Sequence, residues 1–222
     1  VVGSSIAREA DDVLYTWAGP EIAVATSKGY STQLAALNLV GLYLANLLGT
    51  VEEETYQAVL TELQALPDKM SRYLENYEDT KYFASRFFNH SSIFFIGRNL
   101  DYAMGLEGSL KLKEISYIHS EAYASGELKH GTISLIEPGT LVVALGTCAA
   151  LFDKAMSNVV EVKARGATVL AVTTEGFRER MEKFAGGVIS VPETHPLLQP
   201  SLSIVPLQLF AYYAAGMKGC DI

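Results

Sequence analysis

Ile93-Phe94-Phe95-Ile96 is a continuous apolar run that ends at Gly97 and leads into a helical pattern over about 102–117. An unbroken apolar run is typical of a strand that is buried on both faces of a sheet. Similar runs follow at 141–145, 168–173 and 188–191, with predicted helices at 152–165 and 178–184 between them. Because strands alternate with helices, we expect a parallel sheet with helices on both faces. The predicted fold class is α/β.

The flanking sequence is predicted to be mostly helical. A short strand is expected at 12–17, and helices are expected at 28–48, 51–77 with Pro67 as a kink or break, 80–89 and 203–217.

A short pattern occurs twice, each time in a predicted helix. Gln33-Leu34-x-Ala36-x₄-Gly41 recurs as Gln208-Leu209-x-Ala211-x₄-Gly216. If each copy closes an α/β unit, residues 1–50 are the C-terminal remnant of a first unit, and residues 51–222 form a second unit with its leading helices. The chain is then expected to be a piece of a longer protein.

Charge and composition exclude several classes of protein. The chain has 17 Lys and Arg against 25 Asp and Glu, a net charge of −8, so a nucleic-acid partner is not expected. Two cysteines, Cys148 and Cys220, cannot form a disulfide framework or a cysteine-based metal site. No secretory signal and no apolar run of about 18 residues are found, so no membrane partner is expected. We expect a soluble, cytoplasmic protein without a metal or a cofactor.

Three ionisable residues share one stripe of the helix predicted at 102–117. Glu107, Lys111 and Glu114 stand at i, i+4 and i+7, so their directions differ by only about 60°. One interpretation is an ion triplet within the helix, worth about 0.2–0.5 kcal/mol per pair. The other is the wall of a cleft, in which a carboxylate beside an ammonium group acts as a general base.

Two histidines lie nearby in the sequence. His130 follows Gly126 and precedes Gly131, and such a turn lets the backbone approach a ligand closely. It is either a ligand-facing residue or a solvated turn residue. His119, at the expected end of the helix, is interpreted as a partner of the helix dipole.

These residues also carry a resemblance to a known family. The segment from Leu106 to His119 and the segment from Glu121 to Gly131 resemble the signature of the isomerase half of the glutamine–fructose-6-phosphate aminotransferases, as do residues 3–11, 21–28 and 205–209. This half contains two sugar-isomerase (SIS) domains, each a parallel sheet flanked by helices. The resemblance therefore implies a SIS-type sheet, with part of a preceding SIS unit at the N-terminus.

The resemblance also implies a reaction and the roles of several residues. These enzymes convert fructose 6-phosphate, with ammonia from glutamine, to glucosamine 6-phosphate. By resemblance, Glu114 moves a proton between C1 and C2 of the sugar, and Lys111 stabilises the charge of the enolamine. Glu107 lines the pocket, and the backbone around Val24 and Thr26 contacts sugar hydroxyls.

The remaining expectations concern partners. By resemblance, His130 assists opening of the sugar ring and reaches the site from the other subunit of a homodimer. The family's phosphate-binding loop, its ring-opening lysine and its glutaminase domain are expected outside residues 1–222, so this piece alone is expected to have little or no activity. Two alternatives remain open: a non-catalytic SIS module that binds a sugar phosphate, and a piece that serves only as a dimer interface.

Overall fold

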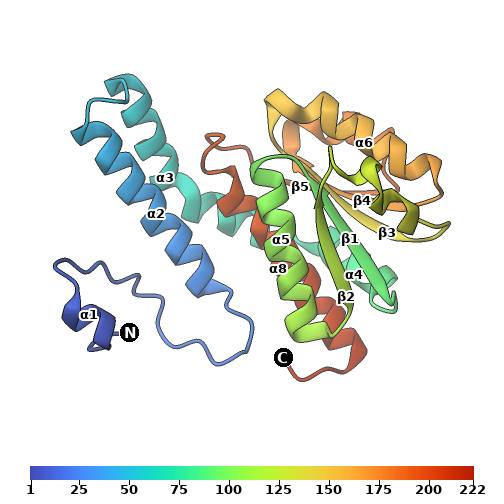
Figure 1. The fold of residues 1–222 in the computed structure, drawn as a ribbon, viewed down its shortest axis with the longest axis horizontal. Helices are drawn as coiled ribbons and strands as arrows, with labels where there is room; N and C mark the ends of the chain where they lie inside the picture. Colours follow the sequence, from blue (N-terminus) through green and yellow to red (C-terminus); the bar gives the residue numbers. More distant parts are fainter.

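Five parallel strands form one sheet in the computed structural model, which describes all of residues 1–222 (Figure 1). The strands lie in the order β2-β1-β3-β4-β5, and each neighbouring pair is parallel. Their bounds are Ser92–Gly97 (β1), His119–Ala124 (β2), Leu141–Gly146 (β3), Thr168–Thr174 (β4) and Gly187–Val191 (β5). The predicted parallel α/β sheet is confirmed.

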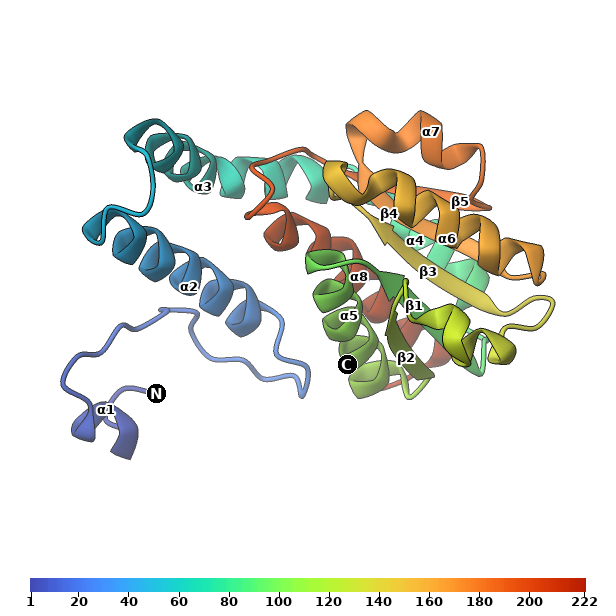
Figure 2. The ribbon, with the colours of Figure 1, turned by 45° about the horizontal axis from the view of Figure 1, so that its top comes forward.

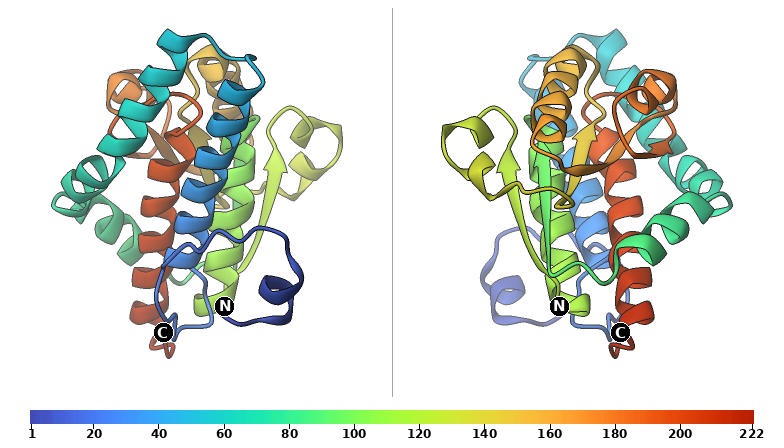
Figure 3. Two further views of the ribbon diagram at one scale, coloured as in Figure 1. Left: turned by 90° about the vertical axis from the view of Figure 1, so that its left-hand side faces the viewer. Right: turned by 90° about the vertical axis from the view of Figure 1, so that its right-hand side faces the viewer.

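Helices cover both faces of the sheet. Their bounds are Ser5–Glu9 (α1), Lys28–Leu47 (α2), Glu53–Leu74 (α3), Glu78–Phe87 (α4), Leu100–Ser116 (α5), Phe152–Ala164 (α6), Arg178–Glu182 (α7) and Gln199–Lys218 (α8), with short 3₁₀ helices at Leu128–His130 (η1), Thr132–Leu135 (η2), Ala149–Leu151 (η3) and Glu175–Phe177 (η4). Helices α4, α5 and α8 pack on one face, and α6 and α7 pack on the other (Figure 3). None of these helices has the length and hydrophobicity needed to cross a membrane.

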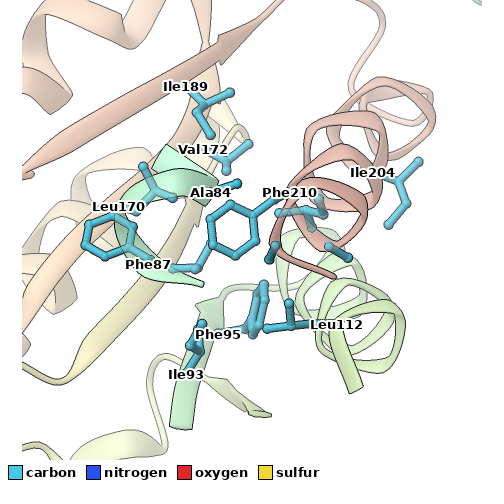
Figure 4. Close-up of a cluster of buried hydrophobic side chains, with 14 of the residues drawn as sticks. Ala84, Phe87, Ile93, Phe95, Leu112, Leu170, Val172, Ile189, Ile204 and Phe210 are labelled. Carbon is cyan, nitrogen blue, oxygen red and sulfur yellow. The ribbon is translucent and has the colours of Figure 1, made fainter. Parts of the chain in front are cut away.

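Two hydrophobic clusters, one on each face, explain the unbroken apolar runs. Alternate residues of a strand point to opposite faces, so Ile93 and Phe95 join the cluster under α4, α5 and α8, while Phe94 and Ile96 join the cluster under α6. Figure 4 shows side chains of β1, β4 and β5 meeting those of the three helices in the first cluster. Both faces of each central strand must therefore be apolar.

Helices α5 and α8 approach each other closely at a glycine. A Cβ atom built on Gly108 would lie 2.7 Å from Leu207 Cδ1 and 3.2 Å from Leu207 Cβ. Gly105, one turn earlier on α5, is also buried, but a Cβ there would be 3.5 Å or more from its neighbours. The absence of a side chain at Gly108 thus sets how near α8 lies to α5.

The N-terminal part of the chain extends away from the sheet (Figure 2). Helix α2 packs against α3, where Leu42 contacts a small cluster that includes Val59 and Leu66. Its other side leaves Leu37 and Leu47 about two-thirds exposed. The division into a remnant at 1–50 and a second unit at 51–222 stays a prediction.

Several predicted elements differ from the structure. The predicted strand at 12–17 is wrong: no strand lies beside this segment to pair with it, and Trp17 is 83% exposed. Strand β2 was not predicted, because this edge strand begins with three polar residues, His119, Ser120 and Glu121, and has no continuous apolar run. Helix α3 continues through Pro67. Helix α8 begins at Gln199 and not at 203. Pro200 is tolerated in its first turn, because the backbone N–H that proline lacks would have no partner within the helix there.

The close approach at Gly108 gives a testable prediction. We expect Gly108→Ala to lower the free energy of unfolding by about 1–3 kcal/mol relative to Gly105→Ala, because only the first substitution overpacks the α5–α8 contact. Both variants gain the same helix propensity, so their difference isolates the packing. Urea unfolding followed by circular dichroism measures it. Equal stability of the two variants would show that α8 moves freely relative to α5.

Candidate active site

Helix α5 brings Glu107, Lys111 and Glu114 together as an ion triplet. The Lys111 Nζ lies 2.6 Å from Glu114 Oε2 and 3.5 Å from Glu107 Oε1. The side chains of Lys111, Glu107 and Glu114 are 4%, 13% and 25% exposed. The triplet is therefore not on a solvated face. A buried ammonium group is stable only when it is paired, and here two carboxylates pair with it.

The segment before α2 covers this triplet. The Lys111 Nζ donates a hydrogen bond to the Thr26 carbonyl oxygen, at 3.4 Å. Ala25 is buried against the core under α5 and α8, whereas Val24 is exposed. Residues 24–26 thus lie against Lys111 although they are more than 80 residues away in sequence. Of the predicted site residues, the structure brings together Thr26, Glu107, Lys111 and Glu114, with Val24 two residues from Thr26.

Burial shapes the electrostatics of the site. Desolvation raises the pKa of Glu107, and the attraction of the Lys111 ammonium lowers it in opposition. Burial, with a smaller contribution from the Glu107 charge, also raises the pKa of Tyr30, whose hydroxyl lies 3.8 Å from Met104 Sδ. Glu114 Oε2 is shielded from solvent and faces Lys111, while the Glu114 side chain as a whole is 25% exposed. Two carboxylates against one ammonium leave the triplet able to accept a proton.

His130 lies elsewhere in the same chain. It ends η1, six residues beyond the carboxyl end of β2, and it is exposed. Glu114 lies near the C-terminal end of α5, which leads into the amino end of β2. The two residues are therefore separated along the whole length of β2, and the η1 segment projects from the side of the molecule (Figure 3). The structure does not bring His130 to Glu114 within one chain.

His119 does not have the expected position. It is the first residue of β2 and not part of the end of α5. Its Nδ1 lies 3.0 Å from Ser92 Oγ, and its Nε2 lies 3.7 Å from Glu121 Oε1. The helix instead ends at Tyr117 in a left-handed conformation. The interpretation as a dipole partner is therefore wrong.

A separate cavity of about 500 Å³ lies at the carboxyl ends of β3 and β4. Its lining includes Asn99, Thr147 and Thr174, and no Lys, Arg or His lines it. Asp101, also in its wall, is buried and accepts hydrogen bonds from the Thr147 backbone N–H and hydroxyl. Burial raises the pKa of this carboxyl group, and the hydrogen bonds from Thr147 oppose that rise. This carboxylate tethers the loop after β3 and takes no part in the triplet.

Two residues near the triplet were not predicted from the sequence. Tyr30 in α2 lies beside Glu107, and nothing in the sequence around it indicates this proximity. Gln208 in α8 donates a hydrogen bond to the carbonyl oxygen of Ser27. The sequence pointed to it only through the repeated Gln-Leu pattern and through the resemblance of residues 205–209, and neither indicated this contact. No group of three His, Cys, Asp or Glu side chains is placed to hold a metal ion.

Comparisons with known proteins identify similar chains. The chain is 55% identical over 222 residues to a glutamine–fructose-6-phosphate aminotransferase (isomerizing) from Caldanaerobacter subterraneus subsp. tengcongensis, and 52% identical to one from Clostridium acetobutylicum. Both alignments cover the whole chain but only 36% of the relative, so the chain spans about a third of the length of these curated relatives.

A solved structure is also similar. The C-terminal domain of a glucosamine-fructose-6-phosphate aminotransferase from Francisella tularensis superposes with a TM-score of 0.95 at 36% identity, over all of this chain and 63% of that one. The family model of the SIS domain matches residues 86–218, which hold the whole sheet, α5 and all of α8. The fold is the SIS-type α/β fold expected from the sequence, and the chain belongs to the SIS domain family.

Proposed function

We propose that this chain is the sugar-phosphate isomerase portion of a glutamine–fructose-6-phosphate aminotransferase, which makes glucosamine 6-phosphate from fructose 6-phosphate and ammonia derived from glutamine. The name shared by relatives at more than 50% identity supports the proposal. The observation that carries it is Lys111, whose buried ammonium is held between two carboxylates of different exposure. A single buried ammonium facing two carboxylates places a fixed cation beside a potential proton acceptor, which is the pairing that a proton transfer on a sugar needs.

In the proposed reaction, Glu114 is the base. Ammonia first replaces the C2 carbonyl oxygen as an imine, with release of water. The Glu114 carboxylate then takes a proton from C1 of this open-chain imine and returns it to C2, while the C1 hydroxyl proton passes to the nitrogen, so that a 2-amino aldose forms. The Glu114 side chain is 25% exposed, the most exposed of the three, so it is the one proposed to meet the substrate. A carboxylate that is partly desolvated beside a cation can exchange a proton without leaving its place.

Lys111 stabilises the negative charge that develops on the substrate between the two proton transfers. A fixed ammonium in a site that excludes water interacts strongly with such a charge. Glu107 lines the pocket and pairs with the Lys111 ammonium from the side opposite Glu114 in sequence. The backbone around Val24 and Thr26 contacts sugar hydroxyls, since this segment lies on Lys111.

His130 takes part in ring opening from a second subunit, so the working unit is a homodimer. The separation of His130 from Glu114 within one chain supports this arrangement, because an exposed histidine on a projecting turn can enter a neighbouring site. The apolar side of α2 that remains exposed provides further surface for assembly.

The proposed enzyme has further parts, which correspond to the remaining length of the relatives. These parts are a glutaminase domain that supplies ammonia and a segment that binds the sugar phosphate. A cytoplasmic location is part of the same proposal and agrees with two cysteines that form no disulfide.

The role of Glu114 can be tested in the full-length enzyme. We expect Glu114→Gln to lower the isomerisation rate by about 10²–10⁴-fold, because the amide keeps the shape but cannot accept the proton. Binding of fructose 6-phosphate, measured by calorimetry, is expected to stay within a few fold. Glu179→Gln, at an exposed glutamate of α7 on the other face of the sheet, is the matched control.

Two outcomes would contradict the proposal. Near-normal turnover of the Glu114→Gln enzyme would return the triplet to a structural role. A wild-type enzyme that binds the sugar phosphate without converting it would favour the non-catalytic binding module.

The shared site can be tested by mixing subunits. Glu114→Gln and His130→Ala enzymes are each expected to be nearly inactive. Mixed dimers are expected to recover about a quarter of wild-type activity on random mixing, since half the dimers are mixed and each has one intact site of two. The measurement is isomerase activity after co-expression of differently tagged subunits. If purified mixed dimers show no recovery, His130 does not act across the dimer.

A further inference from the structure

Gln208 is placed at the site by the close packing of α5 and α8. It follows Leu207, the residue that packs against Gly108 of α5. Gly108 in turn lies one helical turn before Lys111. Its Nε2 donates a hydrogen bond to the Ser27 carbonyl oxygen at 3.3 Å. Helix α8 therefore contacts the segment that covers Lys111, although the proposed reaction gives Gln208 no role.

The neighbouring peptide unit is held from two opposite sides. The Ser27 N–H donates to Glu21 Oε1 at 2.5 Å, and the Lys28 N–H donates to the same oxygen at 3.0 Å. The carbonyl of that same Thr26–Ser27 peptide accepts the hydrogen bond from Lys111 at 3.4 Å. Because a peptide unit is planar, it cannot rotate without breaking the contacts to Glu21 and to Lys111 together.

The next carbonyl along the chain, that of Ser27, accepts a hydrogen bond from Gln208 and also from the Ser31 N–H and the Ser31 hydroxyl, each at 3.2 Å. Gln208 is the contact from α8 to this carbonyl, and together with the Ser31 contacts it limits rotation about the backbone bonds of Ser27. Lys111 has three N–H donors, and its acceptors are the two carboxylates of α5 and the Thr26 carbonyl. The direction of the third donor therefore depends on how the segment is held.

We infer that Gln208 is a positioning residue of the proposed isomerase site: its amide holds the Ser27 carbonyl, so that the Thr26 carbonyl stays on the Lys111 ammonium. The catalytic consequence rests on the proposed function, whereas the effect on the backbone does not. Gln208 touches no reacting atom. It acts through residues 24–28, the segment proposed to contact the sugar.

The inference depends on the hydrogen-bond donor and not on the volume of the side chain, so three variants separate the possibilities. Gln208→Met keeps the length and removes the donor. Gln208→Glu keeps the shape but places a carboxylate against a carbonyl oxygen, so it also repels the segment. Gln33→Met is the matched control, because Gln33 occupies the same place in the first copy of the repeated pattern and is exposed on α2.

The first measurement is amide hydrogen exchange of Ser27 and Lys28 in the full chain, followed by NMR. Gln208→Met is expected to speed exchange about fivefold to tenfold, the effect of one lost hydrogen bond. Gln208→Glu is expected to speed it further at neutral pH, and Gln33→Met is expected to leave it unchanged. Exchange equal to wild type in both Gln208 variants would overturn the inference.

The second measurement uses the full-length enzyme and fructose 6-phosphate. We expect KM to rise about threefold to tenfold in Gln208→Met while kcat changes less than twofold, and the rise to be larger in Gln208→Glu. If the thermal midpoint and kcat fall together, Gln208 has a general structural role and the inference is wrong. If the wild-type enzyme does not isomerise the sugar, the proposed function fails, and the exchange measurement still decides the role of Gln208.

Discussion

The burial of the Lys111 ammonium is the constraint that organises this part of the molecule. A cation with only 4% of its side chain exposed is stable only if nearby acceptors replace water, and the chain supplies three. Two are carboxylates on the same helix, and the third is the Thr26 carbonyl, which comes from a distant segment. Removing any one of these acceptors leaves a buried donor unpaired. The site therefore ties α5, α8 and the segment before α2 into one arrangement.

The packing of α5 explains how this arrangement is reached. Along one helix, Gly105 lies against the sheet, Gly108 admits α8, and Lys111 faces the covering segment. Because Gly108 allows α8 to approach closely, the side of α5 that carries Lys111 lies deep enough to be shielded from water. The hydrophobic cluster between α5 and β1 then fixes the position of α5 relative to the strands. Catalytic positioning and stability thus depend on the same contacts.

The sequence was informative where burial leaves a side-chain pattern. The apolar runs predicted strands β1, β3, β4 and β5, because both faces of each are buried. The triplet was predicted from its helical spacing. The edge strand β2 was not predicted, since half-buried residues break the apolar run, and the predicted strand at 12–17 was wrong because the presence of a neighbouring strand cannot be seen in local sequence. A backbone acceptor such as the Thr26 carbonyl has no side-chain signal at all. For Gln208, the repeated pattern drew attention to the residue without indicating its contact.

The central claim, that burial and pairing of Lys111 control the charges of the site, is tested most directly by the protonation of Glu107. Carboxyl ¹³C NMR over a pH series gives the pKa of this side chain, and Glu107→Gln identifies its resonance. The account predicts a pKa above the ordinary value for glutamate in the wild-type chain, because desolvation outweighs the pull of Lys111. It predicts a further rise in Lys111→Met, because the cation that opposes desolvation is then absent. A Glu107 that titrates as an exposed glutamate, with no change in Lys111→Met, would contradict the account.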